Sequence, residues 1–288
     1  MNLTTASVSR RSFLAGAGAL VAAGSLAACS NGSEGSGSAA AVDSPVTLTV
    51  AASPSPHAVI LNDFAASRLA DEGIELEVKE YTDYILPNQD TTSGDVDANY
   101  FQHINYLNNY NEENGTDLVN VGKIHFEPMG VFPGKSSDID NIADGATIAV
   151  PNDPTNEGRA LLLLQDLGLI TLDADAGITA TPNNIAENPH NIQFSEQEAA
   201  ALPRTVADVD FAVINGNYAI DAGLDLADAV AQEDASSDVI QEEYANVIVT
   251  TSDKEDDERI ATLVNILQSD EFKSFLQETF GDAVQAAF

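Results

Sequence analysis

The chain has 288 residues, of which 46 are acidic and 11 are basic, so its formal net charge at pH 7 is −35. A surface this acidic repels phosphate backbones and anionic lipid head groups, which argues against binding to nucleic acid. The length is ample for one large domain or two lobes. Because the acidic residues are spread along the whole chain, we expect a salt-adapted surface and a fold that needs salt to screen self-repulsion.

The first 29 residues have the features of an export signal with a lipidation site. A twin-arginine pattern at Ser9–Leu14 precedes an apolar run from Ala15 to Ala28, and the single cysteine, Cys29, follows Leu-Ala-Ala as in a lipobox. The sequence predicts a twin-arginine lipoprotein signal peptide over residues 1–28 and a lipid on Cys29 that anchors the chain to the extracytoplasmic side of the cell membrane. An uncleaved signal anchor is the alternative, although the run is short for a membrane span.

Residues 29–45 are rich in Gly, Ser and Ala and predict a flexible tether. After it, Val46–Ala52 and Ile74–Val78 have strand patterns, and Ala58–Leu69 between them has a helical pattern, which together predict a βαβ unit. His57 stands at the turn from strand to helix. It is either a polar residue at a helix start or a residue of a ligand cleft.

Strands continue to alternate with helices, which predicts an α/β fold. A strand at Gly122–Phe132 is expected to cross into a second lobe. We expect lobe 1 to contain residues 46–132 and 243–288 and lobe 2 residues 133–242, joined by hinge strands. The other expected strands are Ala146–Val150, Ile178–Ala180, Asn191–Phe194, Val209–Ile214 and Asn246–Thr250, and the other expected helices are Arg159–Gln165, Glu196–Leu202, Glu255–Leu267 and Ser269–Thr279.

The stretch from Ala149 to Ala160 predicts a strand, a polar loop and a helix start. Ligands of open α/β sheets bind at this end of a strand. Pro154 suits the first helical turn, which Asp153 or Thr155 can cap, and the helix N-terminus can attract an anion. Arg159 can then add a bidentate fork for a carboxylate, with Asn156 beside it. A plain capped helix with a solvated Arg159 is the alternative.

Two further stretches place polar and aromatic groups together. Asn99–His103 combines amide, aromatic and imidazole side chains, which suit a small amphipathic ligand, although Phe101 and Tyr106 could also be core residues. Asn215 follows the buried strand pattern at Val209–Ile214, where it can bind a ligand or form an ordinary Asn-Gly turn.

Three stretches resemble, in the same order, motifs of the MetQ/NlpA family of methionine-binding lipoproteins. They read DANYFQH at 97–103, PNDPTNEGRALLLLQ at 151–165 and DFAVINGNYA at 210–219, and the segment His125–Gly130 is similar as well. The resemblance covers residues 46–288. It implies a two-lobed, type II periplasmic-binding-protein-like fold without catalytic activity or a cofactor. It also implies capture of L-methionine or D-methionine for the permease and ATPase of an ABC importer.

The resemblance also implies roles for individual residues. Arg159 would pair with the ligand carboxylate, Asn156 and Asn215 would hold its amino and carboxylate groups, and an enclosure of aromatic and imidazole groups would surround the thioether. That enclosure consists of Tyr84, Phe101 and His103, and His57 and Asn217 are further candidates. Tyr100 and Asn217 depart from residues that are common in the family, so the ligand could be another small amino acid or a dipeptide.

Two alternatives belong to other classes of protein. A metal-delivery lipoprotein would need the four histidines to converge, and their spacing predicts no metal site. An extracellular hydrolase would need a nucleophile with a base partner, and no such pattern is present in the sequence.

Overall fold

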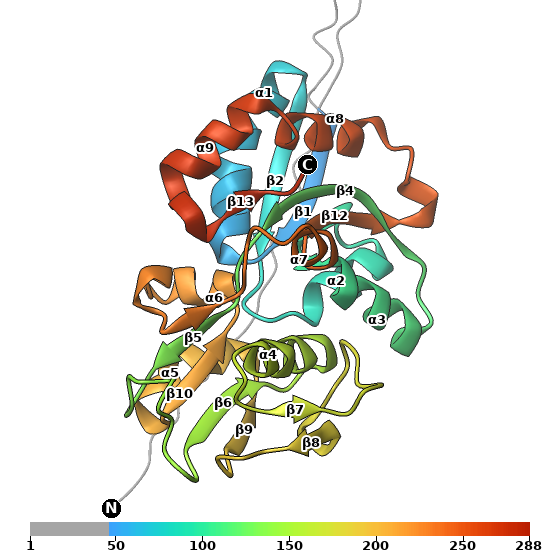
Figure 1. The fold of residues 1–288 in the computed structure, drawn as a ribbon. Helices are drawn as coiled ribbons and strands as arrows, with labels where there is room; N and C mark the ends of the chain where they lie inside the picture. Colours follow the sequence, from blue (N-terminus) through green and yellow to red (C-terminus); the bar gives the residue numbers. More distant parts are fainter. Residues whose placement is uncertain (1–45) are drawn as a thin grey trace, which may run out of the picture. The chain divides into compact units, whose positions relative to one another are not determined.

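The structure is a computed structural model in which residues 46–288 are described, except for the side chains of residues 238–240. The signal peptide and tether expected over residues 1–45, with Cys29 and its lipid, lie outside the described residues. Residues 46–288 belong to one compact unit with one large sheet in each lobe and a small two-stranded sheet. Figure 1 shows the two lobes, each with helices packed around its own sheet, so the predicted α/β fold is confirmed.

The sheet of lobe 1 has six strands in the order β13-β4-β12-β3-β1-β2. They are β1 (Val46–Ala52), β2 (Ile74–Glu80), β3 (Ala98–His103), β4 (Leu118–Phe126), β12 (Asn246–Thr251) and β13 (Gln285–Ala286). β1 pairs in parallel with both β2 and β3, whereas β12 runs antiparallel to β3 and β4. The carboxyl ends of β1 and β3 therefore point the same way, toward the second lobe.

Apolar faces of surrounding helices cover this sheet. The helical elements of lobe 1 are η1 (Pro54–Ala58), η2 (Ile60–Ala65), α1 (Ala66–Asp71), α2 (Leu86–Ser93), α3 (Ile104–Asn114), α8 (Glu258–Leu267) and α9 (Asp270–Phe280). Phe64, Phe272 and Leu263 pack with strand residues such as Leu48 and Ile124 in one buried cluster. The lobe thus has its own core, which fixes the ends of its strands.

Lobe 2 contains a five-stranded sheet in the order β11-β5-β10-β6-β9. Its strands are β5 (Gly130–Pro133), β6 (Thr147–Pro151), β9 (Gln193–Gln197), β10 (Phe211–Ile214) and β11 (Ala231–Gln232), and a hairpin of β7 (Thr171–Leu172) and β8 (Ile185–Glu187) lies apart from it. Its helices are α4 (Pro154–Asp166), α5 (Leu202–Thr205) and α6 (Gly216–Asp221), and α7 (Asp238–Glu243) lies in the segment that leads back to lobe 1. β6 and β10 are parallel neighbours, so the loops that follow them meet at one edge.

The chain crosses between the lobes twice. The first crossing is Glu127–Met129, between β4 and β5, and the second joins β11 to β12. The single strand predicted over Gly122–Phe132 is wrong, because Pro128 has no N–H group to continue a ladder and β5 pairs with β10 of lobe 2. Residues 130–132 therefore lie with lobe 2 rather than lobe 1.

Two local predictions in lobe 2 are wrong. Ile178–Ala180 is not a strand, because it forms a turn whose backbone lies against Gly158 of α4. Glu196–Leu202 is not one helix, because Glu196 and Gln197 extend β9 and pair with the end of β6. Helical structure begins only at Ala199–Ala201 and α5, where Pro203 occupies the first turn instead of closing a helix. Sheet pairing overrides the helix propensity of this Glu- and Ala-rich stretch.

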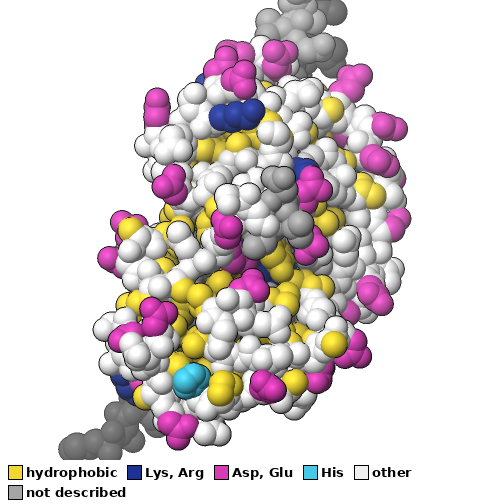
Figure 2. Space-filling view, viewed as in Figure 1, with side chains coloured by type: hydrophobic (Ala, Val, Ile, Leu, Met, Phe, Trp, Pro, Cys, Tyr) yellow, Lys and Arg dark blue, Asp and Glu magenta, His cyan; other side chains and the backbone are white. Residues whose placement is uncertain are grey.

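Figure 2 shows acidic side chains scattered over the visible face of both lobes, with few basic ones among them. Within residues 46–288, no helix combines the length and the apolar character that crossing a bilayer would require.

Candidate functional site

A small cavity lies where the two lobes meet. Aromatic side chains of lobe 1 face amide and charged side chains that come mainly from lobe 2 and from the first crossing. The lining residues are Tyr84, Phe101, Gln102, His103, Tyr106, Glu127, Asn156, Arg159, Asn215, Gly216, Asn217 and Asn246. A cavity with one aromatic wall and several convergent polar groups suits a small ligand with a polar head.

The N-terminus of α4 positions Asn156. Asp153 caps this helix by accepting a hydrogen bond from the backbone N–H of Asn156 at 3.1 Å, and Pro154 occupies the first turn, as predicted. The side chain of Asn156 donates back to Asp153 at 2.8 Å, which leaves its Oδ1 directed at the cavity residues. This oxygen accepts from Nδ2 of Asn215 at 2.6 Å and lies 3.2 Å from Nε2 of His103.

His103 ends β3 and caps α3. Its Nδ1 accepts from the backbone N–H of Tyr106 at 3.1 Å, so the ring proton is on Nε2 and is donated to Asn156. Burial, together with the nearby charge of Arg159, lowers the pKa of His103 to about 3. The imidazole is therefore neutral at physiological pH and acts as a polar wall rather than as a cation.

Asn215 stands at the turn between β10 and α6. Its Nδ2 is used by Asn156, but its buried Oδ1 has no hydrogen-bond partner among the described residues. An unpaired buried acceptor is costly unless a ligand or a water satisfies it. Because Asn215 lines the cavity, this oxygen is a ready acceptor for an N–H donor of a ligand.

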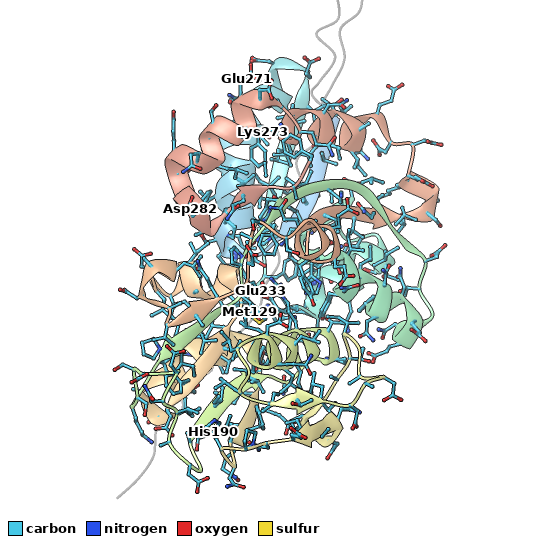
Figure 3. All side chains as sticks on the ribbon, viewed as in Figure 1. Met129, His190, Glu233, Glu271, Lys273 and Asp282 are labelled. Carbon is cyan, nitrogen blue, oxygen red and sulfur yellow. The ribbon has the colours of Figure 1, made fainter. Side chains whose placement is uncertain are left out.

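Arg159 is buried on α4, and most of its donors already have partners. Nε and Nη2 form a bidentate pair with Glu233 at 2.7 and 2.6 Å, and Nη2 also donates to the carbonyl of Glu127 at 2.9 Å. Glu233 thus occupies the Nε–Nη2 edge of the fork that was expected to hold a ligand carboxylate. Nη1 has no hydrogen bond to the described residues and remains for a ligand. Figure 3 shows Glu233 beside Met129 at the level where the lobes meet.

The aromatic wall is formed by three rings of lobe 1. The ring centre of Tyr84 lies 5.9 Å from that of Phe101 and 5.8 Å from that of Tyr106. The hydroxyl of Tyr84 donates to Oδ1 of Asn217 in lobe 2 at 2.5 Å, and Tyr106 donates to the carbonyl of Tyr84 at 2.9 Å. Burial raises the pKa of Tyr84 well above its usual value, so the hydroxyl keeps its proton and the bridge between the lobes persists.

The structure brings most of the predicted site residues together. Arg159, the three asparagines and the predicted aromatic and imidazole groups all line the cavity, namely Tyr84, Phe101, His103, Asn156, Asn215 and Asn217. His57 does not line it. Its ring is fully buried behind the wall, where Nε2 lies 3.0 Å from Oδ1 of the lining residue Asn246.

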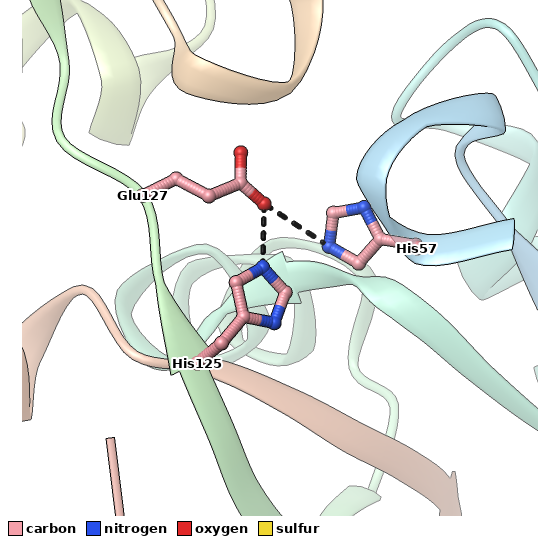
Figure 4. A group of neighbouring side chains, drawn as sticks. All are labelled: His57, His125 and Glu127. Carbon is pink, nitrogen blue, oxygen red and sulfur yellow. Dashed lines mark hydrogen bonds and ion pairs between the residues drawn. The ribbon is translucent and has the colours of Figure 1, made fainter. Parts of the chain in front are cut away.

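Behind the cavity wall, two histidines meet the lining residue Glu127 (Figure 4). Oε1 of Glu127 lies 2.6 Å from Nε2 of His125 and 3.5 Å from Nε2 of His57. The hydroxyl of Tyr100 is hydrogen-bonded to Nδ1 of His125, which is its only acceptor in the described chain. The proton of His125 is therefore on Nε2 and is donated to Glu127.

This arrangement does not fit the metal-delivery alternative. His57, His125 and Glu127 offer ligand atoms within 4.8 Å of one another, but their hydrogen bonds to each other, to Tyr100 and to Asn246 account for the cluster without a cation. The other two histidines lie elsewhere. His103 bonds to Asn156, and His190 lies at the far end of lobe 2 (Figure 3).

Sequence reasoning missed several lining residues, chiefly Glu127, Asn246 and Gln102. Glu127 had a signal, since it is a charged residue inside an otherwise apolar run, directly before Pro128. The sequence pattern instead places it inside the predicted strand Gly122–Phe132. Asn246 opens the last strand of lobe 1 and had no local signal, because its partner His57 is 189 positions away in sequence.

The chain is similar to proteins of known family and structure. The sequence model of the family described as NlpA lipoprotein matches residues 48–288. The D-methionine-binding lipoprotein MetQ of Salmonella typhimurium is 42% identical over 226 residues, which covers 76% of this chain and 82% of the relative. A lipoprotein of Ruminococcus gnavus has a TM-score of 0.81 at 48% identity and covers 83% of this chain and 98% of its own.

A nutrient-binding protein of Burkholderia cenocepacia, solved bound to methionine, has a TM-score of 0.76 at 39% identity, with coverage of 84% of this chain and 100% of its own. The family match spans nearly all of the described residues. The chain belongs to the NlpA lipoprotein family.

Proposed function

We propose that the chain is the substrate-binding lipoprotein of an ABC importer and that it captures methionine between its two lobes. The observation that supports this most directly is the cavity, which places an aromatic wall opposite a polar end. Methionine has the same division, with an apolar thioether and a charged amino-acid head. A Salmonella relative is named for D-methionine, and a Burkholderia neighbour was solved bound to methionine.

The polar end would hold the amino-acid head. Nη1 of Arg159, the part of the guanidinium left open by Glu233, would donate to the ligand carboxylate. The unpaired Oδ1 of Asn215 would accept from the ligand ammonium, while Asn156 keeps both Asn215 and His103 in place. Hydrogen bonds to charged groups contribute about 1.5–3 kcal/mol each.

The aromatic end would enclose the side chain of the ligand. Tyr84 and Phe101, with His103 beside them, would surround the thioether, and sulfur–aromatic contacts add about 0.3–1.5 kcal/mol. Asn217 acts through its hydrogen bond with Tyr84, which closes the cavity between the lobes. His57 supports Asn246 from behind instead of touching the ligand.

A thermal unfolding experiment tests this function. The body without residues 1–29 is stripped of carried-over ligand by partial unfolding and is then heated in high salt with and without L-methionine. Ligand at 100 times its dissociation constant should add about 2.7 kcal/mol to the free energy of unfolding. A clear rise with L-methionine or D-methionine and none with leucine supports the proposal. A rise only with another amino acid or a dipeptide reassigns the substrate, and no rise with any of these ligands contradicts the proposal.

We also propose that a lipid on Cys29 anchors the protein to the outer face of the cell membrane, where it meets the permease and its ATPase. The chain belongs to a lipoprotein family, and its single cysteine follows an export signal. Substitution of Cys29→Ser should move the protein from the membrane fraction to the soluble fraction after export. Retention of the variant in the membrane would contradict a lipid anchor at this residue.

A further inference from the structure

We infer that Glu127 selects ligands that carry a free α-ammonium group, an inference that rests on the amino-acid-binding function proposed above. Among the described residues that line the cavity, Glu127 is the one carboxylate and Arg159 is the one fixed cation. A cavity with one fixed charge of each sign matches a zwitterion. It leaves one buried charge unpaired when the ligand has a carboxylate but no ammonium.

The surroundings of Glu127 favour its ionised form through hydrogen bonds. His125 donates to Oε1 at 2.6 Å, the Nε2 of His57 lies 3.5 Å from the same oxygen, and the backbone N–H of Asn217 donates to the carboxylate. His125 and Asn217 are donors, and the Nε2–H of His57 is donated to Asn246, so a proton on Glu127 would find no acceptor among these neighbours. A carboxylate has about four lone-pair positions, so these two donors leave about two for a ligand.

Glu127 and the open acceptor of Asn215 are neighbours across Gly216. A Cβ atom added at Gly216 would lie only 2.7 Å from Cβ of Glu127, so a side chain at this position would separate the glutamate from the turn that carries Asn215. With glycine there, the carboxylate and the unpaired amide oxygen can both face one ammonium group. Two acceptors explain why a cavity would reject a ligand that lacks this group.

Burial raises the pKa of Glu127, and the charges of His57 and Arg159 and the hydrogen bond from Asn217 offset part of this rise. The titratable and charged groups that face Glu127 come from several elements. They are His57 of η1, Tyr84 before α2, Tyr100 of β3, His125 of β4 and Arg159 of α4. The histidines among them stay neutral, because burial lowers their pKa values to about 4 and about 3. Acid should therefore protonate Glu127 before it charges these histidines.

The experiment compares two ligands on the wild-type protein. L-Methionine and its amine-free analogue, methylthiobutanoate, share the thioether and the carboxylate, and their dissociation constants are measured by calorimetry across a range of pH. We expect the analogue to bind at least about 100-fold more weakly at neutral pH. This ratio should shrink as the pH falls through the pKa of Glu127, because only the ammonium-bearing ligand loses a partner.

The variant Glu127→Gln keeps the size of the side chain and removes its charge. It should weaken L-methionine binding about 10- to 100-fold while the analogue binds as before, so that the preference for the ammonium collapses. An unchanged ratio in this variant, or a pH-independent ratio in the wild type, would overturn the inference. The pH series uses only the wild-type protein, so it decides the question even if the variant does not fold.

The proposed function and this inference fail in different ways. A wild-type protein that binds neither L-methionine nor any other amino acid contradicts the function. A wild-type protein that binds L-methionine and the amine-free analogue equally well keeps the importer role and removes Glu127 as the selecting residue.

Discussion

Removing one partner of the buried pair Arg159–Glu233 should cost much stability, separately from any effect on ligand binding. Each side chain is only 4% exposed, and their two contacts are 2.7 and 2.6 Å long. Oε2 of Glu233 also accepts from the backbone N–H of Met129 at 2.8 Å, so the pair joins α4 to the first crossing. Glu233→Gln replaces one of these acceptors with a donor, which leaves Arg159 partly unpaired. Removing one partner of a buried pair costs about 3–5 kcal/mol.

The free energy of unfolding can be measured with urea at constant high salt and without ligand. We expect a loss of about 3 kcal/mol for Glu233→Gln. The matched control is Lys273→Ala, which breaks the exposed pair with Asp270, whose side chains are 46% and 98% exposed and 3.6 Å apart. That change should cost less than about 0.5 kcal/mol. A Glu233→Gln protein as stable as the control would refute the reasoning, since it would mean that desolvation cancels the attraction.

A double substitution separates stability from binding. Arg159→Met combined with Glu233→Leu removes both charges and should recover most of the lost stability, because well-packed apolar pairs often replace buried ion pairs without cost. Methionine binding should remain lost, since Nη1 is gone. A stable double variant that binds methionine normally would show that Arg159 is structural only. The single change Arg159→Ala cannot show this, because it leaves Glu233 buried without its cationic partner.

Three further predictions concern packing, acid and closure. Gly158→Ala should destabilise the protein by about 1–3 kcal/mol, because its Cβ would lie 1.9 Å from the carbonyl oxygen of Ile178. Gly177→Ala, which has open space around it, should leave stability unchanged. Equal urea unfolding midpoints for the two variants would contradict the packing account. The three buried histidines near the cavity, His57, His103 and His125, have pKa values lowered from 6.5 to about 4 or 3. Their contribution to the free energy of unfolding is therefore complete above pH 6.5 and is lost as the pH falls toward 4. The urea unfolding midpoint in high salt should fall over that range, with proton uptake on unfolding, and an absence of uptake would contradict this. Tyr84→Phe removes the hydrogen bond to Asn217 and should speed the release of labelled methionine about fivefold, which corresponds to about 1 kcal/mol of lost stabilisation. An unchanged release rate would mean that this hydrogen bond does not hold the lobes closed.

Local signals in the sequence were sufficient where neighbouring residues decide the structure. The start of α4 was predicted because Asp153, Pro154 and Asn156 lie within one turn and cap the helix themselves. The cap and the proline specify this geometry without help from distant residues. The same holds for the strands β1 and β10, whose apolar runs have unambiguous lengths.

Predictions failed where a distant segment decides the outcome. Glu196 and Gln197 extend a strand because the end of β6 lies beside them, and no property of the stretch itself shows this. The partner of Arg159 is 74 positions away in sequence, among many exposed acidic residues from which Glu233 does not stand out. The convergence of His57, His125 and Glu127 likewise depends on how β4 and η1 pack in lobe 1. Resemblance to a family supplied many of the lining residues, but it did not supply these supporting contacts.

The position of Arg159 has a mechanical consequence for loading and unloading. One guanidinium lines the cavity with its free nitrogen and, through Glu233, is tied to the first crossing and to the segment that leads into the second. In the proposed complex, a ligand carboxylate on Nη1 would share this positive charge with the hinge, so the stiffness of the hinge would depend on whether the cavity is full. A loaded protein would then differ from an empty one in how readily its lobes part.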